Sequence, residues 1–579
     1  MNNTISITGL GIICAIGNDA PSVLDSLRRG ESGIGTMRYL KSKHKELPVG
    51  EVKLSNDQMK QMLGVDVAQT ISRTSLMGAI AIRQALDSAG ITSLKGRRVA
   101  LISGTTVGGM DISELHFEQM RSDVSLNYLP QGNECGKSTE EMAELLGLDG
   151  VEVCTISTAC SSALNSIILG SEMLRRGEVD VVIAGGSEAL SRFHLNGFNT
   201  LMILDREQCR PFDATRAGLN LGEGAAFVVL ERGKSDAQAY VAGYGNRCDA
   251  FHQTASSESG EGAYLAMKDA LDMAGLAPQD IAYINAHGTG TPNNDMSESQ
   301  GIKRIFGDSI PEVSSTKSYT GHTTSASGSI ECVICVLAMQ NGFTPSNLGW
   351  KNQDEGAITP TMGRSNVELE NVICNSFGFG GNDSSIVLSK HPIAYHTPAT
   401  EYAFEVVADE CVEQAEELAA LREFISPLEA RRMGKLMRAA HLSALRAMQK
   451  AEVTCPDAII TATSRGMLEI SMQFLEDIIS NDEELLKPTL FMQSTHNTIS
   501  SAIAIRNKCH GYNITYSQGS DSMKWAMRDA ERLIATGKAA TVLVVEFDEA
   551  TPALSEAMRK SNLAEPKELF ARSVILKRV

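Results

Sequence analysis

Short apolar runs alternate along the chain with longer amphipathic segments. The apolar runs are rich in Val and Ile and have the length of β-strands, whereas segments such as residues 73–89 and 161–176 have a helical period. Several runs are apolar at every position, which is typical of strands covered by helices on both faces. The pattern predicts an α/β fold with largely parallel sheets and antiparallel closing strands. The predicted strands are residues 5–9, 99–103, 151–157, 179–185, 225–231, 281–286, 372–375 and 385–389.

The pattern of the first part of the chain recurs near its end. Four blocks align in the same order, and their collinearity argues against chance similarity between two α/β segments. We therefore expect residues of about 400–579 to be a degenerate copy of residues of about 1–232, after a linker at residues 391–400 that contains two prolines. The blocks pair residues 72–86 with 431–445, 108–113 with 465–471, 171–189 with 530–550, and 225–232 with 571–578.

The composition is that of a globular protein. The chain has 579 residues, of which 42% are apolar and 21% are charged. At about 100–200 residues per domain, this length predicts three or four domain-sized units. These values exclude a disordered or fibrous chain.

Charge and hydropathy narrow the possible partners and the compartment. The formal net charge of −18 makes nucleic acid a poor partner, although a local basic patch for a small acidic protein stays open. The sequence contains neither a run of 18 apolar residues nor a signal-peptide pattern, and its twelve cysteines are scattered. We therefore expect a cytoplasmic protein with reduced thiols and no membrane span.

A cysteine follows one of the predicted strands directly. In TISTACSSALNSIILGSEMLRRG (residues 155–177), Cys160 stands between the strand and an amphipathic helix. The free N–H groups and the dipole at a helix N-terminus favour the thiolate, which is the nucleophile that acyl transfer needs. A buried cysteine that serves only as a small apolar side chain explains the spacing equally well.

Two histidine loops favour the catalytic interpretation. His287 follows an apolar strand in a loop rich in Gly and Thr, and Lys317 and His322 lie in a similar loop before a helix. A glycine-rich turn at residues 378–381 can bring backbone N–H groups close to a ligand. By contrast, the pair Cys332 and Cys335 lies on an apolar helical pattern without a second pair, so we expect neither a metal site nor a bound cofactor.

These motifs together resemble the β-ketoacyl-acyl carrier protein synthases, the elongating condensing enzymes of type II fatty acid and polyketide synthesis. The resemblance covers residues 1–390. It implies a thiolase-type fold, in which two similar halves form five αβαβα layers, and a homodimer. The motifs are TACSSA around Cys160, AHGTGTPNND at His287, STKSYTGH at Lys317 and His322, NSFGFGGND at Phe379, and RPFDATRAGLNLGEGA at residues 210–225.

The resemblance divides the chain into three parts. Residues 1–235 are expected to form the N-terminal half with the nucleophile, and residues 236–392 the C-terminal half with the His, Lys and His residues. Residues 400–579 are expected to form an extra half-thiolase-like α/β module. Such modules resemble short ketosynthase-like proteins associated with aryl polyene pathways.

The resemblance also assigns the chemical roles. Cys160 would accept an acyl chain from a phosphopantetheine thioester that an acyl carrier protein presents, so phosphopantetheine belongs to the partner. His287 and His322 would donate hydrogen bonds to a malonyl thioester carbonyl and stabilise the enolate formed as carbon dioxide leaves. Lys317 and Glu298 would order the histidines and nearby water electrostatically.

Further residues would shape the site. The backbone N–H groups of Cys160 and Phe379 would form the oxyanion hole. Phe379 also matches a mobile gate residue, and Val107 matches a residue that shapes the acyl pocket. Asn382-Asp383 departs from the Thr-Asn that is common in the family after the glycine pair, which leaves the acyl preference open.

The second copy lacks this chemistry. Ser520 stands where the first copy has Cys160, and no histidine loops follow it, so we expect residues 400–579 to be non-catalytic. The sequence therefore predicts decarboxylative condensation of acyl-carrier and malonyl-carrier thioesters to a 3-oxoacyl product. The alternative is a non-catalytic chain-length or assembly subunit that partners another ketosynthase.

Overall fold

The strands of the protein join into one continuous mixed sheet. The computed structural model describes residues 4–122, 134–394, 401–560 and 565–579, and the strands within these ranges form a 15-stranded sheet and a two-stranded ribbon. The large sheet consists of three sets of five strands. The helices described in these ranges include none that is long and apolar enough to cross a membrane.

The first set of strands has the order β3-β2-β4-β5-β1. Strands β2, β3 and β4 are parallel, and β5 runs antiparallel to its neighbours β4 and β1. This arrangement confirms the prediction of parallel strands with an antiparallel closing strand. The strands are β1 (Ile5–Cys14), β2 (Val99–Gly104), β3 (Glu152–Ile156), β4 (Val181–Glu188) and β5 (Gly224–Arg232).

The second set repeats this order, although the sequences of the two sets do not align. Its strands lie in the order β6-β12-β11-β7-β8, and β12 is antiparallel to both neighbours. Strand β1 pairs with β6 at one end, which joins the two sets. The strands are β6 (Ala239–Cys248), β7 (Tyr283–Asn285), β8 (Glu312–Ser314), β11 (Asn371–Gly378) and β12 (Asn382–Ser389).

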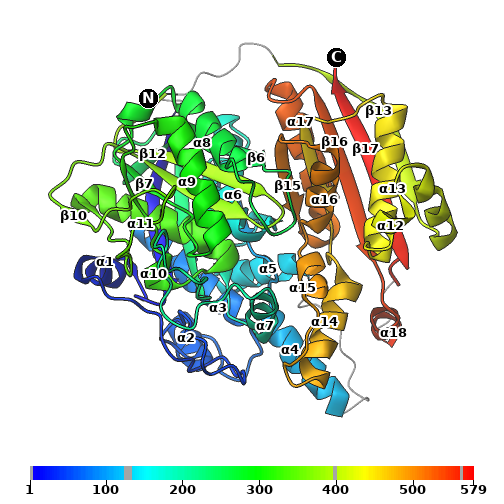
Figure 1. Cartoon of the computed structure of the whole chain (residues 1–579), viewed down its shortest axis with the longest axis horizontal. Helices are drawn as coiled ribbons and strands as arrows, with labels where there is room; N and C mark the ends of the chain where they lie inside the picture. The colour runs from blue at the N-terminus through cyan, green and yellow to red at the C-terminus, as the bar shows by residue number, and fades with distance from the viewer. Residues whose placement is uncertain (1–3, 123–133, 395–400, 561–564) are drawn as a thin grey trace.

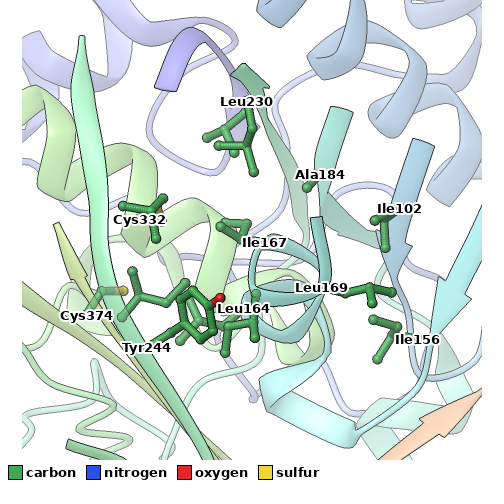
Figure 2. Packing of buried hydrophobic residues seen from close by; sticks show 14 of the residues in the cluster. Ile102, Ile156, Leu164, Ile167, Leu169, Ala184, Leu230, Tyr244, Cys332 and Cys374 are labelled. Carbon is green, nitrogen blue, oxygen red and sulfur yellow. The ribbon is translucent and has the colours of Figure 1, made fainter. Parts of the chain in front are cut away.

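Helices on both faces complete five layers in the first two sets. Helices α6 (Ser162–Arg175) and α11 (Ser327–Asn341) lie between the sheets, whereas α3 (Arg73–Ser88) and α8 (Glu261–Ala274) cover the outer faces. Apolar side chains pack between the helices and the sheets of the central layer, and Figure 2 shows some of them. The thiolase-type layering is thus confirmed. Figure 2 labels Leu164, Ile167 and Leu169 of α6, Cys332 of α11, and the strand residues Ile102, Ile156, Ala184, Leu230, Tyr244 and Cys374.

The C-terminal module, residues 401–579, is a third copy of the same half. Its strands have the order β13-β17-β16-β14-β15, which matches the other two sets position by position. It forms the yellow to red part of Figure 1. The predicted repeat is therefore present in the structure. The strands are β13 (Phe404–Val412), β14 (Ala458–Ala462), β15 (Tyr512–Tyr516), β16 (Thr541–Glu549) and β17 (Leu569–Arg578).

The C-terminal module joins the first half through equivalent edges. Tyr516 of β15 lies opposite Ile156 of β3 in an antiparallel pair. Ser157 N–H donates to the Thr515 carbonyl at 2.9 Å, and the N–H of Ser517 donates to the Thr155 carbonyl at 2.9 Å. Ile156 and Tyr516 occupy equivalent positions in the two copies, and so do the two hydrogen bonds on either side of them. The junction therefore has the self-complementary form of a two-fold dimer contact.

Helix α17 (Ser522–Ala535) seals this junction. Trp525 is 1% exposed, and its indole N–H donates to the Val153 carbonyl at 3.1 Å. Arg528 pairs with Glu152 of β3. The apolar side of α17 that carries Trp525 is therefore covered by the first half of the same chain.

Candidate active site

Cys160 lies in a strained turn between strand and helix. The turn is a short 3₁₀ segment, Ala159–Ser161, that follows β3 and precedes α6. Ala159 has a φ of 51°, in the left-handed region that residues with a Cβ rarely adopt. The turn presents Cys160 at the helix N-terminus with 5% of its surface exposed, where the sequence predicts it.

Both predicted histidines converge on the cysteine. The Nε2 atom of His322 lies 3.1 Å from the Cys160 sulfur. One side-chain nitrogen of each histidine and the sulfur all lie within 4.8 Å of one another, and the ring centroids of His287 and His322 are 5.3 Å apart. All three residues are buried. Residues separated by up to 162 positions thus form one cluster.

Glu298 holds the His287 loop through the backbone. The N–H groups of His287 and Gly288 donate to its carboxylate at 2.9 and 2.8 Å, and the Asn375 amide donates at 3.1 Å. Glu298 belongs to helix α9 (Pro292–Phe306), which begins just after the loop. The carboxylate therefore fixes the position of His287.

Lys317 reaches the site as part of a buried ion pair. Its Nζ atom lies 2.5 Å from the Glu331 carboxylate, and the two side chains are 1% and 3% exposed. Burial raises the pKa of Glu331 to about 7, against the lowering effect of Lys317. The sequence alone does not predict the part that Glu331 plays. Glu331 lies one helical turn after Ser327, whose hydroxyl lies 2.9 Å from Nδ1 of His322, and this helical spacing is the sequence feature that relates it to the site.

Burial sets the protonation states at rest. Desolvation, and then the charge of Lys317, hold the pKa values of His287 and His322 well below the ordinary range, so both rings are neutral near pH 7. Burial raises the pKa of the Cys160 thiol to about 12, although Lys317 and the backbone N–H groups of Phe379 and Cys160 lower it. Desolvation thus outweighs the groups that favour the thiolate. The resting pair is a neutral thiol beside a neutral imidazole.

The Phe379 turn, residues 378–382 between β11 and β12, closes the site. The N–H groups of Phe379 and Cys160 are both directed at the sulfur. The Phe379 ring stacks on Phe198 at a centroid distance of 5.6 Å. Val107 packs against an apolar cluster that includes Phe193 and Phe198, and Phe379 packs against the same cluster. Two backbone donors at one sulfur can form an oxyanion hole, because an acyl oxygen on that sulfur would lie close to both.

A cavity leads to the cysteine. It has a volume of about 350 Å³ and is lined by Cys160, both histidines and Phe379. Its outer wall includes Asn293, which is exposed. A narrow substrate arm can therefore reach the sulfur from the surface.

Family models match three segments of the chain. The beta-ketoacyl synthase N-terminal domain matches residues 2–236, and the beta-ketoacyl synthase C-terminal domain matches residues 238–351. A second model of the N-terminal domain matches residues 407–576. The third match falls on the C-terminal module.

Two known proteins are similar to about two thirds of the chain. A 3-oxoacyl-[acyl-carrier-protein] synthase 2 of Vibrio cholerae is 32% identical over 412 residues, which are 67% of this chain and 99% of that protein. Nodulation protein E of Rhizobium meliloti is 33% identical, covering 67% of this chain and all of that protein. Both relatives are thus matched over nearly their whole length.

Solved structures extend the similarity. The ishigamide ketosynthase/chain length factor is 29% identical, with a TM-score of 0.61 over 68% of this chain and 100% of that chain. The PfaC keto synthase-chain length factor is 17% identical, but its fold matches 100% of this chain and 78% of its own length with a TM-score of 0.79. The fold of the C-terminal module is therefore shared with a solved protein.

Proposed function

Because the chain belongs to the β-ketoacyl synthase family, we propose that it condenses a carrier-bound acyl group with a carrier-bound malonyl group. The products are a 3-oxoacyl thioester and carbon dioxide, as in fatty acid or polyketide synthesis. One observation carries the proposal. The Cys160 sulfur lies 3.1 Å from the His322 imidazole, close to His287 and to two backbone N–H groups.

The first step is acyl transfer to the sulfur. Cys160 attacks the thioester carbonyl while its proton passes to Nε2 of His322, the nearest imidazole nitrogen. The C–S bond to the carrier breaks, and the departing carrier thiolate takes a proton from solvent. The N–H groups of Cys160 and Phe379 stabilise the oxyanion of the tetrahedral intermediate.

The second step is decarboxylation and carbon–carbon bond formation. His287 and the protonated His322 donate hydrogen bonds to the malonyl thioester carbonyl. The bond to the carboxylate breaks, carbon dioxide leaves, and its electron pair enters the enolate. The enolate carbon attacks the acyl carbonyl, the C–S bond to Cys160 breaks, and the thiolate regains its proton from His322.

The substrates reach the site on an acyl carrier protein. The cavity of about 350 Å³ connects Cys160 with the exposed Asn293 and suits the phosphopantetheine arm of such a carrier. The arm belongs to the carrier, and the chain itself needs no tightly bound cofactor for these steps. We place this activity in the cytoplasm, where carrier proteins and reduced thiols occur together.

The C-terminal module takes the place of a second subunit. Ser520 stands in the turn Gly519–Asp521, the counterpart of the Cys160 turn, and is exposed. The module is non-catalytic and pairs with β3 through its own equivalent edge. This internal contact replaces the homodimer that the sequence resemblance implies. Because the module occupies a partner's place beside β3 and has a serine at the nucleophile position, we infer a role like that of a chain-length factor.

The test is covalent labelling followed by turnover. Incubation with an acyl-carrier thioester should add one acyl group to Cys160 in a mass spectrum, and malonyl carrier should then release a 3-oxoacyl product. Cys160→Ser should lose both signals, because a hydroxyl ionises far less readily than a thiol. Ser520→Ala, the matched change in the second copy, should keep both. A folded Cys160→Ser protein with normal turnover would refute the proposal.

A further inference from the structure

The C-terminal module touches the active site through one buried amide. Asn497 immediately precedes helix α16 (Thr498–Asn507) and is 1% exposed. Its Nδ2 atom donates to the Phe379 carbonyl at 2.9 Å and to Oδ1 of Asn382 at 2.6 Å. Both acceptors belong to the Phe379 turn. A residue of the C-terminal module thus hydrogen-bonds to the turn that contributes an oxyanion N–H.

The position of Asn497 makes this contact unusual. An asparagine that immediately precedes a helix commonly accepts a hydrogen bond from a backbone N–H of the first helical turn. Asn497 makes no such bond to its own helix. The side chain instead directs both amide hydrogens to the Phe379 turn. The helix therefore forgoes a local stabilising contact in favour of one with the active site.

Helix α16 also packs closely against the Phe379 turn. Gly380 has a φ of +85°, and a Cβ at this position would lie 2.0 Å from the Ser501 hydroxyl oxygen of α16. The first turn of α16 therefore lies directly against the Phe379 turn. Any rotation of the peptide after Phe379 must break the bond from Asn497 or displace α16.

Buried amides continue the contact towards the nucleophile. Asn382 donates to Oδ1 of Asn513 at 2.9 Å, and the Asn513 N–H donates to Asn246 at 2.9 Å. Asn246 donates to Asn165 at 2.9 Å, and Asn165 donates to the hydroxyl of Thr158, two residues before Cys160, at 2.9 Å. All are buried. Because buried amides are costly unless they are bonded, this network favours one arrangement.

The network explains a departure from the family pattern. Asn382 stands where a threonine is common. The Asn382 amide accepts from Asn497 through oxygen and donates to Asn513 through nitrogen. A threonine hydroxyl is shorter and has a single polar atom for both bonds. Asn382 thus suits a chain that supplies its own C-terminal module.

We propose that Asn497 is a positioning residue for the active site, through which the C-terminal module holds the Phe379 turn in register with Cys160. The proposal rests on the proposed function, because the turn supplies the N–H group of Phe379 to the oxyanion. The N–H and the carbonyl of Phe379 lie on either side of the same Cα. A hydrogen bond that fixes the carbonyl therefore restricts the orientation of the N–H.

The experiment compares Asn497→Ala with the wild-type full chain in steady-state condensation and in single-turnover acylation of Cys160. Removal of an oxyanion donor costs about 100–1000-fold in kcat, and a loosened donor retains part of its effect. We expect a fall of about 10-fold in kcat and in the acylation rate, with KM for the acyl carrier within about 2-fold of wild type. Asn382→Thr removes the bond that Asn497 donates to Oδ1 of Asn382 but leaves its bond to the Phe379 carbonyl, so we expect a smaller fall.

A double-mutant cycle separates positioning from general destabilisation. Because Asn497→Ala and Asn382→Thr both remove the Asn497–Asn382 bond, their combined effect should be smaller than the product of the two single effects. Gln518→Ala is the matched control, since buried Gln518 bonds with Thr155 and Glu140 across the same junction without touching the turn. Its kcat should be unchanged.

The outcomes are distinct. Wild-type kcat in folded Asn497→Ala, or multiplicative effects of the two variants, would overturn the positioning role alone. A wild-type chain that does not acylate Cys160 would overturn the proposed function and this inference with it. If Asn497→Ala does not fold, Asn382→Thr decides by the same measurements.

Discussion

Desolvation governs the reactivity of single residues in this site. Cys160 is held as a thiol with a pKa raised to about 12, and the pKa values of both histidines are held well below the ordinary range. The positive charge of Lys317 favours the thiolate but is itself paired with Glu331. We therefore expect the reaction to depend on proton transfer within the cluster, and the 3.1 Å contact supports His322 as the proton acceptor.

The two histidines should differ when each is removed. His322→Ala should slow acylation of Cys160 by about 100-fold or more, because the thiol loses its proton acceptor. His287→Ala should leave acylation within a few-fold of wild type and slow decarboxylation. Mass spectrometry of the acyl adduct measures the first step, and release of labelled carbon dioxide from malonyl carrier measures the second. Equal acylation rates in the two variants would contradict the assignment.

Asp383 should make stability depend on pH. Its side chain is buried, and burial, followed by the charge of Asp249, raises its pKa well above the ordinary range. The unfolded carboxyl loses its proton near pH 4 while the folded one keeps it, so stability falls as pH rises from about 4 to the folded pKa. Asp383→Asn should therefore increase the free energy of unfolding, and more at pH 8 than at pH 5. Urea unfolding at both pH values checks this, and a gain that is larger at pH 5 would refute it.

Equivalent elements have diverged according to what covers them. Helix α6 is enclosed between two sheets, and 12 of its 14 residues are buried. Its counterpart α17 has 8 buried residues among 14, and Lys524 lies on its exposed side. The polar substitutions occur because no second half covers that side of the module. The buried side, centred on Trp525, still docks on β3.

Trp525 should hold the C-terminal module in place. Trp525→Ala removes a fully buried ring and leaves the Val153 carbonyl without its donor. We expect a loss of about 3–5 kcal/mol in the free energy of unfolding of the module, the usual cost of such a truncation. Lys524→Ala, an exposed change on the same helix, should have little effect. The urea midpoint measures both, and an unchanged midpoint in Trp525→Ala would contradict the packing argument.

At the scale of the whole molecule, one five-stranded plan occurs three times. The first two copies face each other across α6 and α11, and the third extends the sheet through the β3–β15 pair. An exposed edge strand tends to pair with another chain. In this chain, β15 of the C-terminal module pairs with the β3 edge in a self-complementary way. It therefore makes the contact that a second copy of the chain would otherwise make.

The state of assembly should therefore depend on the C-terminal module. The full chain should elute in size-exclusion chromatography with light scattering as a monomer of 62.2 kDa. A chain that ends near residue 396 should dimerise or aggregate, because β3 and its apolar surroundings become exposed. A truncated chain that stays monomeric at the same concentration, or a full chain that dimerises through β3, would contradict this expectation.

The sequence by itself determined the local features of this protein. The alternation of apolar runs predicted the α/β layers, the strand followed by Cys160 and a helix predicted the nucleophile turn, and the spaced blocks predicted the third copy. Each of these signals is written in neighbouring residues or in a constant offset, so sequence reasoning can find it. The convergence of Cys160, His287, Lys317 and His322 followed from the family resemblance rather than from spacing.

The tertiary structure alone decided which side chains meet and how they ionise. It brought Glu331 to Lys317, gave His322 rather than His287 the contact with the sulfur, and set Asn497 against the Phe379 turn. These contacts join residues on separate elements, and sheet order and helix packing determine such distances. The raised pKa of Cys160 also could not be predicted from the sequence. It depends on desolvation by all the groups that surround the sulfur, and these come from several elements and not only from the helix that follows Cys160.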